Sequence, residues 1–444
     1  MQGKALPGFR DFYPDDLALR SHIFTVWKTV AHRYGFEEYD GPPLEPLELY
    51  TRKSGEEIVQ QLYAFTDKGD REVALRPEMT PTLARMVGAR AQALKKPIRW
   101  FSIPQLFRYE RQQRGRLREH FQLNMDLIGE GGPLADAELI AAALDIMRAF
   151  GLGPKDVKVR VSDRRVLRAL FAGRGIGEAQ LPEAFQALDK SERDPKEAIA
   201  DRLQKAGLAA KAVDGVFDVA GLKGLPRVEQ ALAKVAGGEE AGAPLAEVVA
   251  ALGAMGLGDF VEVDLTIVRG LAYYTGAVFE LFDAQRTLRA ICGGGRYDDL
   301  LKQIGGVDLP CAGFGMGDVV LAELLKDRGA APPAPAVVDV FLVAISGEDT
   351  IPVLELAHRL RDAGVSVEYA LKHGAIRRQL ELAAARGAKH AVIIGPDERK
   401  DGVAVVRDLA GGTERRVPLD AIRHGILSPT DGAAGDGSVA HSRT

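Results

Sequence analysis

The stretch Val268-Arg-Gly-Leu-Ala-Tyr-Tyr-Thr-Gly276 carries an arginine and two adjacent tyrosines between glycines. Glycine lets a backbone approach a ligand closely, and tyrosine hydroxyl groups can orient a polar ring in a binding site. Taken alone, the stretch fits a packed aromatic turn at least as well, because such turns are common. Its meaning therefore depends on the motifs that lie on either side of it.

Two glycine-dense motifs follow this stretch, Gly293-Gly-Gly-Arg-Tyr-Asp298 and Gly313-Phe-Gly-Met-Gly317. Neither has the spacing of a dinucleotide-binding or Walker loop, so a Rossmann or P-loop enzyme is disfavoured. The triple glycine comes after a predicted strand from Leu288 to Cys292. It indicates either a tight turn or a backbone packed closely against another element.

Upstream, Phe107-Arg-Tyr-Glu110 ends a predicted strand from Pro97 to Tyr109. Residues two apart on a strand share a face, and a charged pair such as Arg108 and Glu110 needs partners or a ligand. A structural ion pair is the commoner explanation for such a pair.

The next loop, Arg111-Gln-Gln-Arg-Gly-Arg-Leu-Arg118, places four arginines in eight residues. Their planar forks match phosphate oxygens, although a solvated basic hairpin tip fits the loop equally well.

The segment Arg76-Pro-Glu-Met-Thr80 places a carboxylate and a hydroxyl at the end of a short predicted strand. Such a pair can hold an ammonium group, but Thr80 could instead cap the helix that follows. No metal site is predicted, because the eight histidines lack ligand spacing. No Gly-x-Ser-x-Gly nucleophile elbow occurs either.

The composition is that of a globular protein with several domains. The chain has 444 residues, 46 % of them hydrophobic, and a net charge of −4, which excludes disorder over its whole length. Its two cysteines, Cys292 and Cys311, cannot build a disulfide scaffold or a cysteine zinc site. We therefore expect a reducing compartment, most simply the cytoplasm. No apolar run approaches the roughly 18 residues of a membrane span, and the charged start is not a secretory signal.

The patterning divides the chain into segments of different character. Residues 1–152 and 256–330 mix helices and strands, whereas residues 153–255 read as an inserted helical module. Residues 331–336 form a proline-containing linker. Strands and helices then alternate over residues 337–427, which predicts a small, largely parallel sheet. Residues 428–444 are expected to be disordered.

In their order along the chain, these motifs resemble those of histidyl-tRNA synthetases, which are class II aminoacyl-tRNA synthetases. The likeness runs from about Leu6 to Ile422 and includes Pro7-Gly-Phe-Arg-Asp11, the segment around Pro42 and Ala391-Val-Ile-Ile-Gly395. The resemblance implies an α/β protein. Its α+β catalytic domain would have an antiparallel sheet flanked by helices, with an inserted helical domain and a C-terminal α/β anticodon-binding domain. It also implies a homodimer.

The resemblance implies a two-step ligation that uses histidine, ATP and tRNA(His), with Mg²⁺ arriving on ATP rather than in a protein-held site. It implies Arg108 and Arg269 as catalytic arginines at the α-phosphate. The implied ATP-binding residues are Arg108, Glu110, Arg116 and Arg118. The implied histidine-binding residues are Glu78, Met79, Thr80, Arg108, Gln122, Asp126, Arg269, Tyr273 and Tyr274. Gly293, Gly294 and Gly295 would form the floor of the pocket. Either Asp126 or one of the two tyrosines would hold the imidazole, and an imidazole-binding carboxylate would reject apolar side chains of similar size.

Two positions depart from the family pattern. Ala272 stands where the family usually has an aspartate, and Val320 stands where an arginine normally covers the adenine and the γ-phosphate. Both changes together resemble a branch typical of plant organelles and some bacteria. We expect Arg114, Arg116 or Arg118 to supply the missing charge.

Two other assignments compete with a synthetase. One is the regulatory subunit of ATP phosphoribosyltransferase, which resembles the catalytic domain alone. The other is an amino-acid ligase that uses no tRNA. The predicted C-terminal domain disfavours both, and the presence of Arg108, Glu110 and Arg269 disfavours the first. In that domain Arg377, Arg378, Arg415 and Arg416 are candidate phosphate contacts, although such charges usually form a solvated face.

Overall fold

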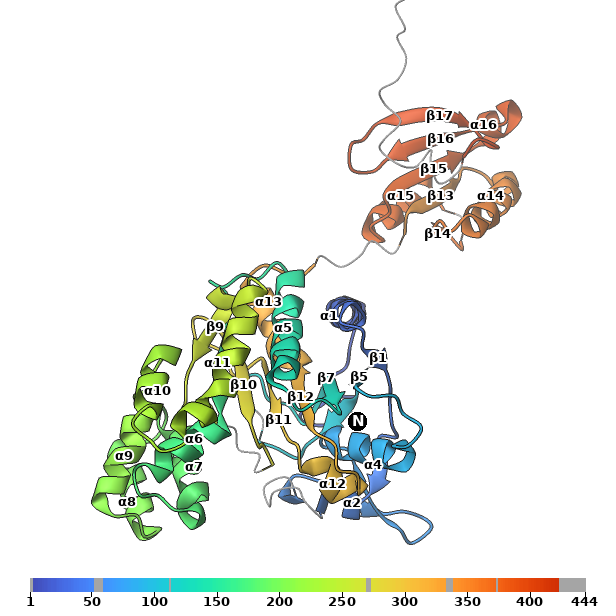
Figure 1. Ribbon diagram of the computed structural model, residues 1–444. Helices are drawn as coiled ribbons and strands as arrows, with labels where there is room; N and C mark the ends of the chain where they lie inside the picture. The colour runs from blue at the N-terminus through green and yellow to red at the C-terminus, as the bar shows by residue number, and fades with distance from the viewer. Residues whose placement is uncertain are drawn as a thin grey trace, which may run out of the picture. The chain divides into compact units, whose positions relative to one another are not determined.

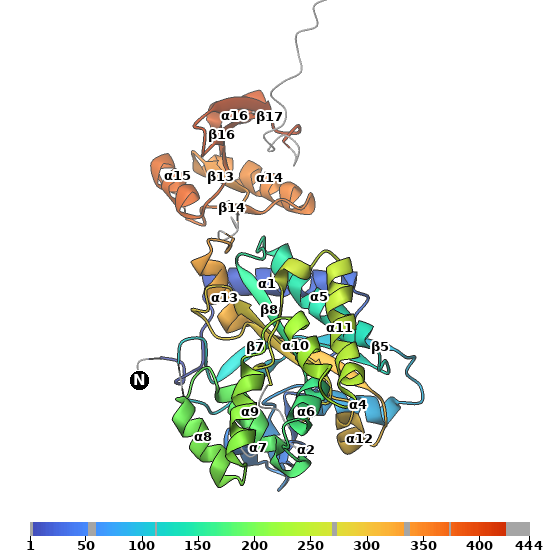
Figure 2. The same ribbon diagram turned by 60° about the vertical axis from the view of Figure 1, so that its left-hand side comes forward.

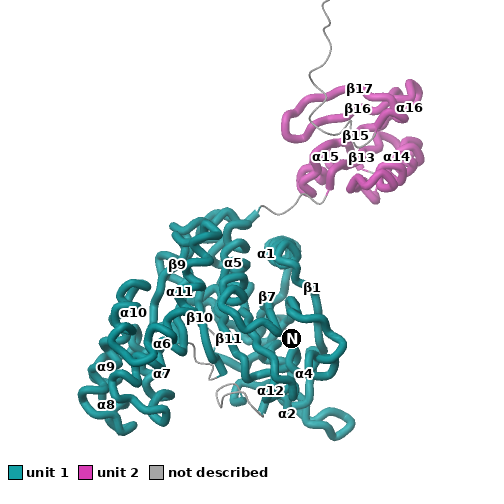
Figure 3. Tube along the Cα trace, in the orientation of Figure 1, with its two compact units in different colours: residues 1–332 teal, residues 333–444 magenta. Residues whose placement is uncertain are grey.

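The structure is a computed structural model that describes residues 3–51, 59–111, 113–268, 273–332, 338–372 and 374–422. It divides the chain into two compact units, residues 1–332 and 333–444 (Figure 3). Arg269, Ala272 and the predicted disordered tail lie outside the described residues, as does most of the predicted linker.

An antiparallel sheet forms the centre of the first unit. Its six inner strands run in the order β5-β7-β12-β11-β10-β8, and each pairs antiparallel with its neighbours. Their bounds are β5 Ile98–Ser102, β7 Glu119–Ile128, β12 Cys311–Gly317, β11 Cys292–Arg296, β10 Ala277–Asp283 and β8 Val157–Asp163. The implied antiparallel catalytic sheet is thereby confirmed.

Short strands extend this sheet. At its two edges, β1 (Glu37–Glu38) and β9 (Val261–Val263) pair parallel with β5 and β8. A further short strand, β6 (Gln105–Phe107), pairs with the start of β7. A separate three-stranded sheet has the order β2-β4-β3. Its strands are β2 Leu44–Pro46, β3 Tyr63–Thr66 and β4 Glu72–Leu75, and the short helix α2 (Glu48–Thr51) follows β2.

Helices cover the central sheet (Figure 1). Helix α5 (Pro133–Ala149) contacts β7, β8, β10, β11 and β12 and also packs against α1 (Pro14–Arg33). Most of its alanine, leucine and isoleucine side chains are buried, because other elements surround it. Helix α13 (Asp318–Asp327) follows β12 directly and packs against β7 and α1.

Helices α4 (Thr80–Arg90) and α12 (Leu300–Gly305) approach each other unusually closely. A Cβ atom built on Gly88 would lie 2.4 Å from the carbonyl oxygen of Gly305. Only glycine fits at Gly88, and this contact joins the C-terminal half of α4 to the end of α12.

Short helices occupy the stretch between β8 and β9 (Figure 2). They are α6 Arg164–Ala172, η1 Glu178–Gln180, α7 Leu181–Lys190, α8 Lys196–Lys205, α9 Ala210–Ala220, α10 Leu225–Leu232, α11 Gly238–Ala254 and η2 Gly258–Phe260. Their buried apolar side chains belong to the same apolar cluster as those of the central sheet. The helical stretch therefore shares a core with the sheet.

The second unit contains a five-stranded sheet in the order β14-β13-β15-β16-β17. Its first three strands are parallel and the last two pairings are antiparallel. The strands are β13 Val340–Ala344, β14 Val367–Tyr369, β15 His390–Ile394, β16 Val403–Asp408 and β17 Glu414–Pro418; the helices are η3 Gly347–Asp349, α14 Thr350–Asp362, α15 Ile376–Ala385 and α16 Pro396–Asp401. The predicted parallel sheet is thus correct for three strands. The alternation of strands and helices in the sequence did not predict the antiparallel hairpin of β16 and β17.

Three strand predictions need correction. The segment from Pro97 to Tyr109 splits into β5 and β6 around Pro104, which has no backbone N–H to donate. Arg108 and Glu110 therefore follow a strand rather than lie on one. The strand predicted over Leu288–Cys292 begins only at Cys292 and contains the triple glycine. Strand signals in the sequence predict a third strand from Phe260 to Ile267, but only Val261–Val263 form a strand there, β9.

None of the helices in the described part of the chain has the length and apolar character needed to cross a bilayer.

Candidate active site

Two adjoining pockets lie over β7, β11 and β12, and they share a wall. Arg108, Gln122, Gly293 and Gly315 line both of them. The larger pocket has a volume of about 310 Å³ and the smaller one about 80 Å³. The strand register explains the shared wall. Gly315 on β12 pairs with Gly293 on β11. Two residues further along β12, Gly317 pairs with Gln122 on β7. The side chain of Arg108 can therefore contact ligands in both pockets.

A buried carboxylate lines the smaller pocket. Asp126 lies on β7 and accepts a hydrogen bond from the hydroxyl of Tyr297. Burial raises the pKa of Asp126 to about 7, although the hydrogen bond from Tyr297 acts in the opposite direction. A Cβ atom on Gly313 would lie 2.1 Å from the Asp126 carboxylate, so glycine leaves the room that this side chain needs.

The opposite side of the smaller pocket comes from the loop between β4 and α4. Glu78 is buried there, and Thr80 is the first residue of α4. The N-cap of that helix is Met79, so Thr80 is not the N-cap that the alternative explanation required. Arg108 donates from Nε to the carbonyl oxygen of Pro77 at 2.9 Å, which ties the loop to the shared wall. A carboxylate and a hydroxyl in this position suit an ammonium group.

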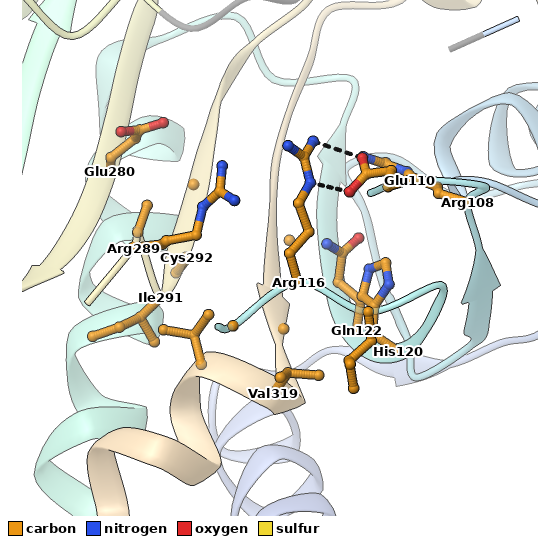
Figure 4. A pocket seen from close by; sticks show the side chains of 17 residues that line it. Arg108, Glu110, Arg116, His120, Gln122, Glu280, Arg289, Ile291, Cys292 and Val319 are labelled. Carbon is orange, nitrogen blue, oxygen red and sulfur yellow. Dashed lines mark hydrogen bonds and ion pairs between the residues drawn. The ribbon is translucent and has the colours of Figure 1, made fainter. Parts of the chain in front are cut away.

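The larger pocket is lined by Arg116 from the loop of residues 111–118, called the arginine loop, and by Arg108 and Glu110 just before it (Figure 4). Arg116 forms two hydrogen bonds to the buried carboxylate of Glu110, one of them 2.6 Å from Nη2 to Oε1. The loop turns at Gly115, whose φ of +73° favours glycine. His120 also lines this pocket, and burial together with Arg108 and Arg10 lowers its pKa to about 3. His120 is therefore neutral near pH 7, and arginines supply the positive charge.

Most of the predicted site residues come together in these pockets. The smaller one is lined by Glu78, Thr80, Arg108, Gln122, Asp126, Tyr273, Tyr274 and Gly293. The larger one adds Glu110 and Arg116. Segments far apart in the sequence thus meet at one place, as the resemblance implies. Arg269, the second predicted catalytic arginine, lies outside the described residues.

Some predicted residues line neither pocket. Met79 is buried with its sulfur 3.9 Å from Arg76. Arg118 stacks over the ring of Tyr109 at 4.0 Å and donates to the Glu110 carbonyl at 3.3 Å. Arg114 turns away toward α13, where it pairs with Glu323 at 3.1 Å. Of the three arginines expected to replace a missing cation, only Arg116 lines the larger pocket.

Only one of the three glycines predicted to form the pocket floor lines a pocket. Gly293 lines both pockets, but Gly294 and Gly295 are not part of either lining. A Cβ atom on Gly294 would lie 2.3 Å from the carbonyl oxygen of Gly313, and one on Gly295 would lie 2.6 Å from that of Ala277. These two glycines allow strands to pack closely. The triple glycine is therefore a tightly packed strand and not a tight turn.

Sequence reasoning missed several lining residues. In the smaller pocket these are Asn124, Tyr297, Gly313, Phe314 and Gly315. Asn124 lies between Gln122 and Asp126 at the same strand parity, so alternation along β7 could have found it. In the larger pocket Glu280 and Arg289 are the charged residues that were missed. Arg289 had no signal, because it belongs to no recognisable motif in the loop between β10 and β11.

Within the described residues, no group of three or more His, Cys, Asp or Glu side chains is placed to hold a metal ion. The arrangement instead joins a small polar cavity with acidic groups to a larger, arginine-lined cavity. Chemically, it can hold a zwitterion with a polar side chain beside a polyanion, and Arg108 lies between the two.

Comparison with known proteins shows what the whole chain is similar to. A family model described as histidyl-tRNA synthetase matches residues 8–318, and one described as anticodon binding domain matches residues 339–428. The chain is 48 % identical over 426 residues to a histidine–tRNA ligase of Opitutus terrae, covering 95 % of this chain and 97 % of that protein. It is 40 % identical over 412 residues to a chloroplastic/mitochondrial histidine–tRNA ligase of Arabidopsis thaliana, covering 93 % and 84 % of the two chains.

A solved structure shares the fold as well. The histidyl-tRNA synthetase from Nostoc sp. PCC 7120 matches with a TM-score of 0.81 at 25 % identity, covering 95 % of this chain and 98 % of that one.

Proposed function

The chain belongs to the histidyl-tRNA synthetase family, and we propose that it joins histidine to tRNA(His) by chemistry at the border of its two pockets. It is an aminoacyl-tRNA synthetase, a histidine–tRNA ligase. The observation that carries the assignment of the site is the position of Arg108, which lines both pockets. A guanidinium at that border can contact two reactants at once.

Histidine occupies the smaller pocket in this proposal. Glu78 and Thr80 hold its ammonium group, and Asp126 accepts a hydrogen bond from its imidazole. An apolar side chain of similar size would leave the Asp126 carboxylate buried without a ligand partner, which is costly. This cost supplies selectivity for histidine. Tyr273, Tyr274 and Gln122 complete the walls.

ATP occupies the larger pocket, with its α-phosphate next to Arg108. A histidine carboxylate oxygen attacks that phosphorus, and the bond to the departing pyrophosphate breaks. Negative charge on the α-phosphate region is stabilised by a fixed cation, which lowers the barrier. Arg108 is held for this task by its bond to Pro77. Arg116 contacts the outer phosphates, and Arg269 is proposed as a second arginine from the resemblance.

The remaining partners follow from the same proposal. Mg²⁺ arrives with ATP, bound to its phosphate oxygens, and the histidyl group then passes from the adenylate to the 3′ end of tRNA(His). The second unit binds the tRNA, and its exposed Arg378, in the first turn of α15, is a candidate contact. We further propose a homodimer, supported by the exposed apolar side chains of Leu44 and Phe65 on the three-stranded sheet. A cytoplasmic location fits the two free, buried cysteines.

Two measurements test the proposal. The first is ATP–pyrophosphate exchange that depends on histidine, and the second is charging of total tRNA with labelled histidine compared with other amino acids. We expect both activities to be specific for histidine. Exchange without charging would instead favour a tRNA-independent ligase. Absence of exchange would favour the regulatory protein, although the full-length similarity to histidine–tRNA ligases disfavours it.

A further inference from the structure

Arg289 is a guanidinium in the larger pocket that has no partner in the described part of the chain. It lies in the loop between β10 and β11 and lines the pocket with its side chain exposed. Arg116 is paired with Glu110 and Arg108 donates to Pro77. Among the described residues, by contrast, Arg289 makes no hydrogen bond and no ion pair. Its charge is therefore available to a ligand.

Arg289 lies beside the arginine loop and α13. A Cβ atom built on Gly115 would lie 3.2 Å from Cγ2 of Val320 and 3.9 Å from Cδ of Arg289. The three residues therefore meet at one point on the pocket wall. Val320 is the position where the resemblance expects an arginine, and Arg289 brings a guanidinium to the same wall from a different segment.

The charges of this pocket suit a polyanion. Its lining includes the arginines Arg108, Arg116 and Arg289 and the glutamates Glu110 and Glu280, and three minus two leaves one net positive charge. Glu110 is already bound twice by Arg116. Burial, together with repulsion from Arg116, lowers the pKa of Arg289 below its ordinary value. An anion placed between the two guanidinium groups would relieve this repulsion. Figure 4 shows both side chains in the pocket.

We propose that Arg289 binds the outer phosphates of ATP and supplies the cation that is missing at Val320. This inference rests on the proposed function, because it takes ATP as the occupant of the larger pocket. Arginine suits the role, because its fork can contact two oxygens of a phosphate group. Arg116 and Arg289 then hold the polyphosphate from two sides.

The test is histidine-dependent ATP–pyrophosphate exchange with the full chain. We expect Arg289→Ala to raise the KM for ATP at least tenfold and to leave the KM for histidine within twofold of the wild type. Arg289→Gln removes the charge but keeps a polar side chain with two of the three stem methylenes, so it should show the same effect if Arg289→Ala folds poorly. Arg286→Ala is the matched control, since Arg286 lies in the same loop and lines neither pocket. It should behave as the wild type.

A second-site variant sharpens the test. Because Val320 and Arg289 meet at Gly115, Arg289→Ala combined with Val320→Arg should recover most of the lost ATP affinity. An unchanged KM for ATP in both Arg289 variants would overturn the inference while leaving the proposed function intact. Absence of histidine-dependent exchange in the wild type would overturn the proposed function instead.

Discussion

The hydroxyl of Tyr297 donates a hydrogen bond to the carboxylate of Asp126, and both side chains line the smaller pocket. Both side chains are buried, and in the described residues Asp126 receives no other side-chain hydrogen bond. A buried carboxylate with so few donors is costly to ionise. The site is therefore built to gain a donor from its ligand, and the imidazole of histidine can provide it.

The cost of ionising the buried Asp126 carboxylate predicts how the stability of the folded chain depends on pH. Burial raises the pKa of Asp126 from 3.8 to about 7 in the folded chain. The folded state therefore binds this proton more tightly than the unfolded chain does, and stability falls as the pH rises from about 4 to about 7. Asp126→Asn removes this titration. We expect the variant to gain stability relative to the wild type by up to about 4 kcal/mol at pH 8, and urea midpoints at pH 5 and pH 8 measure the difference.

The Asp126→Asn variant should also bind histidine more weakly. Without the carboxylate, the KM for histidine in the exchange assay should rise at least tenfold, about 1.4 kcal/mol of lost binding, while the KM for ATP stays near that of the wild type. A stability gain without a change in the KM for histidine would contradict the assignment of Asp126 to the imidazole.

A second prediction concerns Gly313, which leaves room for Asp126. A Cβ atom there would lie 2.1 Å from Oδ1 of Asp126, 2.8 Å from the carbonyl oxygen of Met125 and 2.9 Å from the hydroxyl of Tyr297. Gly313→Ala must therefore displace Asp126 or the strand. We expect the KM for histidine to rise by more than tenfold and the melting temperature to fall.

The matched control lies at the end of the same strand. A Cβ atom on Gly317 would have no heavy atom within 4 Å, so Gly317→Ala should keep the KM for histidine of the wild type. Equal effects of the two substitutions would show that a methyl group added at any glycine of β12 disturbs the site, and the specific role of Gly313 would be lost.

Much of this site could be predicted because its residues are chemically distinctive and appear in a fixed order. Gln122 and Asp126 lie four apart on β7, and strand alternation places them on one face. Arg108 and Arg116 carry charges that would be costly to bury without partners. For such residues the sequence contains both the chemistry and the local geometry.

Other features depend on contacts between distant segments. Nothing in the local sequence distinguishes Arg289 in its loop from an ordinary solvated arginine, and its role arises only where it meets Gly115 and Val320. Gly294 looks like a loop glycine in the sequence. In the structure, glycine is needed there because a Cβ atom would collide with the carbonyl oxygen of Gly313 on the neighbouring strand. Tertiary contacts of this kind cannot be read from spacing.

A third prediction concerns the pair of Glu110 and Arg116. Arg116 donates from Nη2 to Oε1 of Glu110 at 2.6 Å, and a second bond runs from its Nε. Glu110→Gln keeps the shape but removes the charge and one acceptor, so Arg116 loses its fixed orientation. We expect the KM for ATP to rise about tenfold, a loss of about 1.4 kcal/mol, with the KM for histidine unchanged.

Glu323→Gln is the control for this pair. Glu323 accepts from Arg114, an arginine of the same loop that faces away from the pocket. The control should leave both KM values unchanged, and a similar rise in the KM for ATP would indicate that loop position in general, rather than Arg116, controls ATP binding.

The last prediction separates a structural arginine from those proposed to be catalytic. Arg296 stands in the glycine motif, yet it lines neither pocket and is 1 % exposed. Its guanidinium donates to Asp136 at 3.0 Å, to the carbonyl oxygens of Glu130 and Gly132 at 3.1 Å each, and to Asp298 at 3.2 Å. These bonds join β11 to the start of α5.

Arg296→Lys keeps the charge but cannot reach all of these acceptors, so Asp136 is left buried with a poorer partner. We expect the free energy of unfolding to fall by about 3 kcal/mol, measured by urea denaturation, while both KM values at 25 °C remain those of the wild type. Arg148→Lys, at an exposed pair with Asp145, should cost less than about 0.5 kcal/mol. A raised KM for either substrate with unchanged stability would instead place Arg296 in the binding site.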